Sequence, residues 1–420
     1  MRLLFVVSEL PYPPSNGVRL KLASILGYMA SRHDCDVLAI GGAEAVAGCE
    51  PWLKELPRLR ILAAFPAEGV RFLRLRQLVH LIRGSVEWPS MRYRSKALAA
   101  AVGAAVASGR YDVVHFDLIS MAHYCPEAGR AKRVLSLNDS LSLALFARGR
   151  DQRLPFTHRL AARAHGLLQL GADRKLFGLA DAVHLVSEYD ADWSRTRLGR
   201  RNVVHIPVAA QPDSLRVVPS SDQGRSHSLI LIDALWASTQ RRAARRFLAE
   251  QWPSIRGKYP AARLIIIGGA GLPPSFSCFV HSLPGVELHE WVERLPELLA
   301  TVGIAVFPYS HQGGMKNRVL QCMAAGIAVV GTPSSFSGLP VHDGSEVLVA
   351  ESLSGIAVRI DTLLGDVELS RVIGQRARRL ISARFTQEQI GRAWEHLYQD
   401  VATGAPLRSS YSASMEGAEL

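Results

Sequence analysis

Short, continuously apolar runs alternate with amphipathic stretches along the first half of the chain. Residues 3–8 (LLFVVS) and 35–40 (CDVLAI) have the pattern of strands that are buried on both faces. The same pattern recurs at residues 111–116, 133–137, 181–187 and 202–208, and helical patterns separate most of these runs. Strand–helix alternation with continuously apolar strands predicts a parallel, doubly wound α/β sheet.

The alternation stops and then restarts. Residues 209–228 are polar, rich in Pro and Ser and aperiodic, which is typical of an interdomain linker. Further strands are predicted at residues 229–232, 263–268, 286–291, 303–309, 327–332 and 346–350. We therefore predict two Rossmann-like domains, 1–208 and 229–384, that face a common cleft, because doubly wound sheets bind ligands beyond the carboxyl ends of their strands.

The last part of the chain divides into a helix and a tail. Residues 385–401 (FTQEQIGRAWEHLYQDV) begin with a capping box and are strongly amphipathic. This pattern predicts a helix over 385–403, which we expect to cross back to the N-terminal domain. Residues 404–420 are small, polar and aperiodic, so we expect a disordered tail.

The composition narrows the class of partner. The 420 residues carry a formal net charge of +12, which favours anionic partners: nucleic acid, phosphorylated small molecules or an acidic membrane surface. A genome that favours Arg codons is the alternative explanation. The five cysteines are scattered and lack the spacing of a zinc site, which favours a reducing cytoplasm. The N-terminal apolar run is too short for a signal peptide, and no segment reaches membrane-span length without charge.

One loop-to-helix transition has the residues of an anion site. In SHQGGMKNRVLQCMAAGIAVVGTP (residues 310–333) the apolar spacing predicts a helix that begins near residues 315–317. A helix N-terminus presents free N–H groups, and the glycines Gly313 and Gly314 allow a ligand close to the backbone. Lys316 and Arg318 add full charges, so the arrangement suits a diphosphate. The alternative is a solvated basic helix start in which the glycines serve only the turn.

The N-terminal domain has a similar but weaker feature. Gly17 precedes a predicted helix with Arg19 and Lys21 in its first turn, where cations oppose the helix dipole. Such cations indicate an anionic ligand, or they are surface variation. The glycines of IIIGGAGLPPS are not followed by a helix start, which argues against nicotinamide or flavin binding.

These motifs resemble the GT-B glycosyltransferases, specifically the family four-like retaining enzymes that use nucleotide sugars. The resemblance covers nearly the whole chain and is strongest in GGMKNRVLQCMAAGIAVVGTP. Supporting stretches are FLAEQWPSIRGKYPAARLIIIGG, GVELHEWVERLPELLATVGIAVFPY and DAVHLVSEYDADW. The resemblance implies a GT-B fold whose C-terminal domain holds a nucleoside diphosphate sugar as substrate, with no cofactor and no metal.

The resemblance also implies residue roles. Arg318, and as a second candidate Lys316, match basic positions that bind the donor diphosphate, with Asn317 and Gly314 beside them. Gln321 matches a glutamate that bonds the ribose. The region of Trp291 and Val292 matches the segment that touches the nucleobase. Gly17 matches a glycine loop beside the diphosphate.

The sequence departs from the family pattern at several places. The phosphate-binding Arg or Lys that the family has after the first strand of the second domain is not evident in LIDALWASTQRR, although Arg241 and Arg242 lie close by. Gly313 and Gln321 stand where the family has its paired glutamates. Asn138 and Asp139 occupy the turn after the fifth strand, where the family has a histidine, and are therefore candidate catalytic residues together with Arg318 and Lys316. No Asp-x-Asp motif of the metal-dependent type is evident.

The segment GVRFLRLRQLVHLIRG, from Gly69 to Gly84, interleaves arginines with large apolar residues. Such a basic amphipathic helix lies on an anionic bilayer or packs with an arginine-rich outer face. We accordingly expect a cytoplasmic protein, peripheral at the inner face of a membrane if this helix docks there.

The sequence as a whole predicts a glycosyltransferase of the hexosyltransferase type, retaining and metal-independent. It would move a sugar from a nucleotide diphosphate donor to a glycan, lipid-linked or small-molecule acceptor in polysaccharide or glycoconjugate biosynthesis. The alternative is a non-catalytic GT-B-like subunit that has lost the paired glutamates. No nucleic-acid-binding module is recognised, so specific nucleic-acid binding is not expected.

Overall fold

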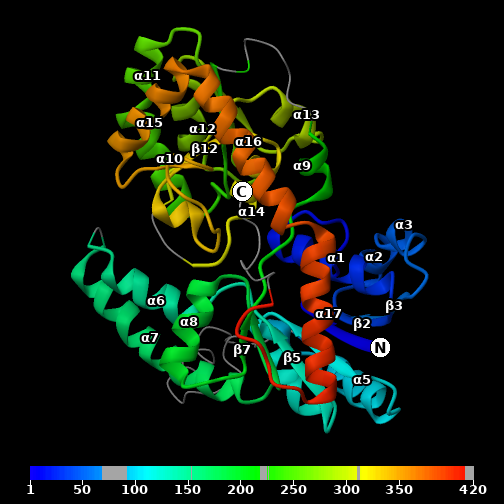
Figure 1. The fold of residues 1–420 in the computed structure, drawn as a ribbon. Coiled ribbons are helices and arrows are strands. Elements are labelled where there is room, and N and C mark those ends of the chain that lie inside the picture. The colour runs from blue at the N-terminus through cyan, green and yellow to red at the C-terminus, as the bar shows by residue number, and fades with distance from the viewer. Residues whose placement is uncertain (69–91, 153, 218–224, 226, 310–312, 412–420) are drawn as a thin grey trace. The chain divides into compact units, whose positions relative to one another are not determined.

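The computed structural model describes residues 1–68, 92–152, 154–217, 225, 227–309 and 313–411. The chain forms two compact units (Figure 1). Unit 1 contains Met1–Ala209 and Gln387–Leu420, and unit 2 contains Ala210–Thr386. Segments 69–91, 153, 218–224, 226, 310–312 and 412–420 lie outside the described residues, and the predicted basic helix from Gly69 to Gly84 falls among them.

Unit 1 is built on a parallel sheet in the order β3-β2-β1-β4-β5-β6-β7. Continuous apolar sequence forms its central strands, whose side chains are almost wholly buried. The strands are β1 (Arg2–Val7), β2 (Asp34–Ile40), β3 (Leu59–Phe65), β4 (Val113–Asp117), β5 (Lys132–Ser136), β6 (Ala182–Leu185) and β7 (Val203–His205). The predicted doubly wound α/β class is confirmed for this unit.

Helices cover both faces of this sheet and enclose two apolar cores. They are α1 (Gly17–Ala30), α2 (Ala43–Ala47), α3 (Glu50–Leu53), α5 (Lys96–Ala107), the 3-10 segment η2 (Ile119–Ala128), α6 (Leu141–Arg150), α7 (Phe156–Phe177), α8 (Glu188–Leu198) and α17 (Gln387–Thr403).

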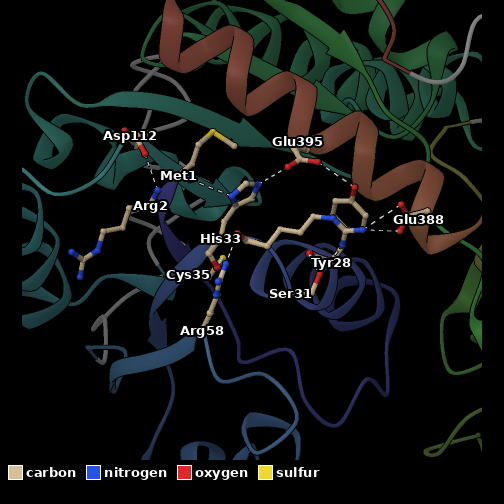
Figure 2. Close-up of polar contacts among 11 residues, drawn as sticks. Met1, Arg2, Tyr28, Ser31, His33, Cys35, Arg58, Asp112, Glu388 and Glu395 are labelled. Carbon is tan, nitrogen blue, oxygen red and sulfur yellow. Dashed lines mark hydrogen bonds and ion pairs between the residues drawn. The ribbon is translucent and has the colours of Figure 1, made fainter.

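Helix α17 packs against α1 although more than 350 residues separate them in the chain (Figure 2). Trp394 and Leu397 of α17 are fully buried in the core of unit 1. Glu395 accepts a hydrogen bond from Tyr28 Oη at 3.2 Å, and its other carboxylate oxygen lies 2.6 Å from His33 Nε2. A Cβ at Gly391 would lie 2.1 Å from the Tyr28 ring, so only glycine permits this approach.

The predicted disorder of residues 404–420 is wrong for residues 404–411. The His205 N–H donates to the Ser409 carbonyl at 2.9 Å, and the Tyr411 N–H donates back to the His205 carbonyl at 3.0 Å. Tyr411 is buried and its hydroxyl donates to Asp400 Oδ2 at 2.7 Å. One aromatic anchor and two backbone bonds to β7 therefore order a segment whose composition is that of a flexible tail.

Unit 2 is built on a second parallel sheet, in the order β10-β9-β8-β11-β12-β13. Its strands are β8 (Ser228–Ile232), β9 (Arg263–Ile267), β10 (Val286–His289), β11 (Ile304–Phe307), β12 (Ala328–Gly331) and β13 (Leu348–Val349). Its helices are α9 (Pro212–Arg216), α10 (Ser238–Glu250), α11 (Trp252–Lys258), α12 (Pro274–His281), α13 (Leu295–Ala300), α14 (Asn317–Ala324), the 3-10 segment η4 (Pro333–Phe336), α15 (Leu353–Gly365) and α16 (Val367–Arg384).

Part of the predicted linker, residues 209–228, is folded onto unit 2. It contains the short helix α9, and the Arg378 guanidinium donates to the carbonyl oxygens of Leu215 and Val217. The polar composition of this stretch therefore reflects a surface segment that is held by side-chain contacts to α16.

Candidate active site in unit 2

The strand order of unit 2 reverses between β8 and β11. From β8 the chain adds β9 and β10 on one side, and from β11 it adds β12 and β13 on the other. In doubly wound sheets ligands bind at this reversal, beyond the carboxyl ends of the strands. Asp233 directly follows β8, Tyr309 lies two residues after β11, and α14 begins eight residues further on.

The start of α14 is built around the two predicted glycines. Gly313 has φ 117° and Gly314 has φ 59°, both in the left-handed region that side chains disfavour. Lys316 is the N-cap residue; its Nζ donates to the Gly313 carbonyl at 2.6 Å and lies 5.7 Å from the centroid of the Tyr309 ring. The lysine thus holds the backbone at Gly313 and places a positive charge at the helix N-terminus.

Arg318 and Gln321 interact directly. The Arg318 guanidinium donates to Gln321 Oε1 at 2.8 Å, and Gln321 is only 7% exposed. Burial lowers the pKa of Arg318, because the charged form loses hydration. Arginine has five N–H donors, and Gln321 supplies one neutral acceptor. A partly desolvated guanidinium with donors to spare is suited to bind phosphate oxygens.

An acid that the sequence reasoning missed lies beside these cations. Burial raises the pKa of Asp233 to about 6, although the Ala234 N–H donates to its Oδ1 at 2.7 Å and Lys316, Arg318 and the Tyr309 hydroxyl oppose the rise. Burial and the nearby Asp233 raise the pKa of Tyr309 well above its usual value, so it stays a neutral donor. The available signal was position: Asp233 directly follows a buried strand.

Aromatic side chains flank the same edge of the sheet. Trp236, in the loop after β8, is 61% exposed, and a Cβ at Gly269 in the loop after β9 would lie 3.2 Å from its ring. The predicted donor residues Trp291 and Val292 follow β10, the edge strand, so β9 lies between them and β8. Trp291 is 66% exposed, whereas Val292 is half-buried. Trp236 is therefore closer to the strand reversal than either predicted residue.

The remaining predicted site residues belong to unit 1. Gly17 is the exposed first residue of α1. Asn138 is half-buried and Asp139 is exposed, and both follow β5. The structure thus brings together Gly313, Gly314, Lys316, Asn317, Arg318 and Gln321 at one end of α14, and it places Gly17, Asn138 and Asp139 in the other unit.

The two cations near the start of α1 have carboxylate partners inside unit 1. Arg19 Nε lies 2.6 Å from Glu9 Oε2. Lys21 is buried, and its Nζ lies 2.8 Å from Asp117 Oδ1 and donates to Ser136 Oγ at 2.9 Å. These internal pairs account for both cations without an anionic ligand.

Among the described residues, no three His, Cys, Asp or Glu side chains are grouped so that they could hold a metal ion. Within the same residues no helix combines the length and the apolar character that a membrane crossing requires.

The fold and the strand-reversal site define an α/β protein with two Rossmann-like units of the GT-B kind. Residues 230–366 match the model of the family described as "Glycosyl transferases group 1". A glycosyltransferase from Rickettsia africae has a similar structure, with a TM-score of 0.66, 13% identity and coverage of 96% of this chain and 99% of that one. HepE from Anabaena, solved in complex with UDP, has a TM-score of 0.64 at 14% identity, covering 95% of this chain and 100% of that one.

A protein of related sequence also matches part of this chain. The N-acetyl-alpha-D-glucosaminyl L-malate synthase of Bacillus anthracis is 27% identical over 150 residues, which are 33% of this chain and 38% of that relative. The match therefore spans little more than a third of the relative's length. The resemblance to GT-B glycosyltransferases is confirmed: the chain has their fold, and residues 230–366 of unit 2 match the group 1 glycosyltransferase model.

Proposed function

We propose that the protein is a glycosyltransferase that moves a sugar from a nucleoside diphosphate donor to a glycan, lipid-linked or small-molecule acceptor. The observation that carries the proposal is the cluster at the strand reversal of unit 2. There Lys316, Arg318 and the N-terminus of α14 lie beyond the carboxyl ends of β8 and β11, inside the segment that matches the group 1 family. HepE of Anabaena, which shares the fold, was solved with UDP bound.

The cluster fits the chemistry of the leaving group. When the glycosidic bond breaks, the departing diphosphate gains negative charge, and fixed cations and N–H donors stabilise that charge. One well-placed donor contributes about 3 kcal/mol to such a transition state. Arg318 is already oriented by Gln321, so little reorganisation is needed when the phosphate arrives. Because these groups can neutralise the charge themselves, we propose a metal-independent transfer. The retaining outcome is proposed from the resemblance to the family four-like enzymes alone.

Sugar recognition would differ from the family pattern. Gly313 offers only its backbone where a glutamate would contact the sugar, and its carbonyl is engaged by Lys316. We propose that Gln321 bonds the ribose through its amide while its oxygen holds Arg318. Asn138 and Asp139 are proposed to stand in for the missing histidine after β5. Trp236, Trp291 and Val292 are the candidates for contact with the nucleobase.

The test is release of nucleoside diphosphate from a panel of nucleotide sugars, with and without a lipid-linked or small-molecule acceptor. Activity that falls at least tenfold in Arg318→Ala but is unchanged in Arg376→Ala, an exposed arginine of α16, supports the proposal. Nucleotide binding without any turnover favours the non-catalytic subunit, and the absence of both binding and turnover contradicts the donor site.

A further inference from the structure

Helix α7 of unit 1 exposes large apolar side chains along one face. Phe156 is 72% exposed, Leu160 57% and Leu167 64%. Their spacings of four and seven residues place all three on the same side of the helix. Scattered single apolar residues are normal on a protein surface, but an aligned row of them marks an interaction site.

Another face of α7 packs against α6 and the core of unit 1. Figure 1 shows α6 and α7 side by side, and these two helices pack against each other. A Cβ at Gly166 would lie 3.3 Å from the Phe146 ring of α6. Gln169 and Asp173 are buried, and the Gln169 amide donates to Asp173 Oδ1 at 2.6 Å. The exposed row is therefore the outer face of a hairpin that is already folded, and not a core that has yet to form.

Arginines lie within the same row. Arg163 is three residues after Leu160 and four before Leu167, Arg174 is seven after Leu167, and both are exposed. Their guanidinium groups also bond neighbouring helices: Arg163 Nε donates to the Gly149 carbonyl of α6 at 3.0 Å, and Arg174 Nη2 donates to the Arg197 carbonyl of α8 at 3.3 Å. Each guanidinium has five N–H donors, so further donors are left for a phosphate. From Phe156 to Arg174 the row spans about 27 Å. The described part of the hairpin, residues 141–152 and 154–177, holds six basic and two acidic side chains, and one acid, Asp173, is buried.

We propose that the outer face of α7 docks on an anionic lipid surface. Apolar side chains interleaved with arginines on one side of a helix are what an interfacial helix requires: the apolar groups enter the headgroup–acyl boundary and the arginines pair with lipid phosphates. The face is distinct from the segment Gly69 to Gly84 and does not depend on the proposed transfer reaction. A second copy of this chain is a poorer occupant, because two identical basic faces would repel each other.

The experiment is co-sedimentation of the full chain with vesicles of phosphatidylcholine alone and of phosphatidylcholine with 30% phosphatidylglycerol, at low and at physiological salt. We expect binding only to the anionic vesicles. The variant Phe156→Ser/Leu160→Ser/Leu167→Ser should bind about tenfold or more weakly. Arg163→Gln/Arg174→Gln should bind about 25-fold more weakly, since each arginine near such a surface contributes about fivefold, or about 1 kcal/mol.

Matched controls separate docking from folding defects. Val358→Ser/Val367→Ser removes exposed apolar side chains of unit 2, and Arg376→Gln/Arg379→Gln removes exposed arginines of α16; both should bind like the unmodified protein. Because both arginines also bond neighbouring helices, the charge-preserving Arg163→Lys/Arg174→Lys variant should retain binding if charge is what matters.

A direct probe complements these variants. Leu160→Trp should show a blue-shifted emission on anionic vesicles and quenching by brominated acyl chains. Three results would overturn the proposal. These are no sedimentation of the unmodified protein, full binding by the triple serine variant, and a concentration-dependent dimer that this variant abolishes. Binding that is lost only in Arg71→Gln/Arg74→Gln/Arg76→Gln would assign the contact to the other segment and would also overturn it.

Discussion

Replacing Lys21 by Met should strongly destabilise unit 1. Lys21 lies where the strand order of this unit reverses between β1 and β4, and its Nζ is 2.8 Å from Asp117 Oδ1 with both side chains buried. The pair continues through a chain of polar contacts: His115 Nε2 lies 3.7 Å from Asp117 Oδ1, and Tyr398 of α17 lies 2.8 Å from His115 Nδ1. Burial lowers the pKa of His115, so the ring is neutral and Lys21 supplies the compensating charge.

The expected magnitude follows from two considerations. Burial by itself would raise the pKa of Asp117, but Lys21 and His115 overcome this and hold the pKa at about 2. Compared with the ordinary value of 3.8, this shift corresponds to about 2–3 kcal/mol of stability. That stability is present above pH 4 and is lost as the pH falls toward 2. Removing one partner of a buried ion pair costs about 3–5 kcal/mol, because the other charge stays buried and uncompensated.

The loss of stability is measured by urea unfolding. Hydrogen exchange with mass spectrometry follows the unfolding, so that the two units are observed separately. Lys21→Met should lower the stability of β1, β4 and α1 by about 3–5 kcal/mol at pH 7, while the protection of unit 2 is unchanged. The double variant Lys21→Met/Asp117→Leu should recover much of this loss, since it leaves no buried charge. A loss of less than about 1 kcal/mol in Lys21→Met, or additive losses in the double variant, would refute the reasoning.

Four further predictions concern single side chains. Burial raises the pKa of Asp173 to about 6, so ionisation of this acid lowers the stability of the protein as the pH rises from 4 to 6. Asp173→Asn should therefore raise the free energy of unfolding at pH 7 by about 3 kcal/mol and change it little at pH 4, as measured by urea unfolding. Arg318→Ala should reduce transfer activity far more than Lys316→Ala, and equal mild losses in steady-state rates would mean a solvated helix start. Gln321→Ala should weaken the affinity for the donor about tenfold in a calorimetric titration, because losing a buried hydrogen-bond partner costs about 1–3 kcal/mol. Gln321→Glu should be tolerated. Asp233→Asn should tighten nucleoside diphosphate binding at pH 7.5, because it removes the negative charge of a carboxylate whose pKa is about 6 and which lies near Lys316. No change in affinity would place Asp233 outside the site.

The sequence predicted those parts of the fold that depend on neighbouring residues. Apolar patterns predicted the six described strands of unit 2: continuous runs indicated the central ones, and β10 was indicated by the alternating sequence VELH. The apolar spacing placed the start of α14 at residues 315–317, where it begins at Asn317. Strand β3 was missed, because its sequence LRILAAF carries Arg60 in a half-exposed edge strand; that arginine pairs with Asp36. An edge strand lacks the continuous apolar pattern that identifies central strands.

The features that the sequence could not predict depend on strand order. Lys21 meets Asp117 because β1 and β4 are neighbours, and Asp233 meets Tyr309 because β8 and β11 are neighbours. Apolar periodicity identifies strands without giving their order in the sheet. The exposure of Leu160 could not be predicted either, for a different reason. An apolar residue at helical spacing is usually interpreted as part of the core, and the sequence does not show which face of a helix is covered.

The central claim is that unit 2 binds a nucleoside diphosphate at the start of α14, with Arg318 on the phosphates. The most direct measurement is calorimetric titration of the full chain with UDP, GDP, ADP, CDP and TDP, repeated with Arg318→Ala and with the control Arg376→Ala. We predict that at least one nucleotide binds and that the control binds it normally. Arg318→Ala should weaken the affinity about tenfold or more, as expected for a charged hydrogen bond worth about 1.5–3 kcal/mol. If no nucleotide binds at millimolar concentration, or if Arg318→Ala binds as tightly as the unmodified protein, the site does not hold the donor.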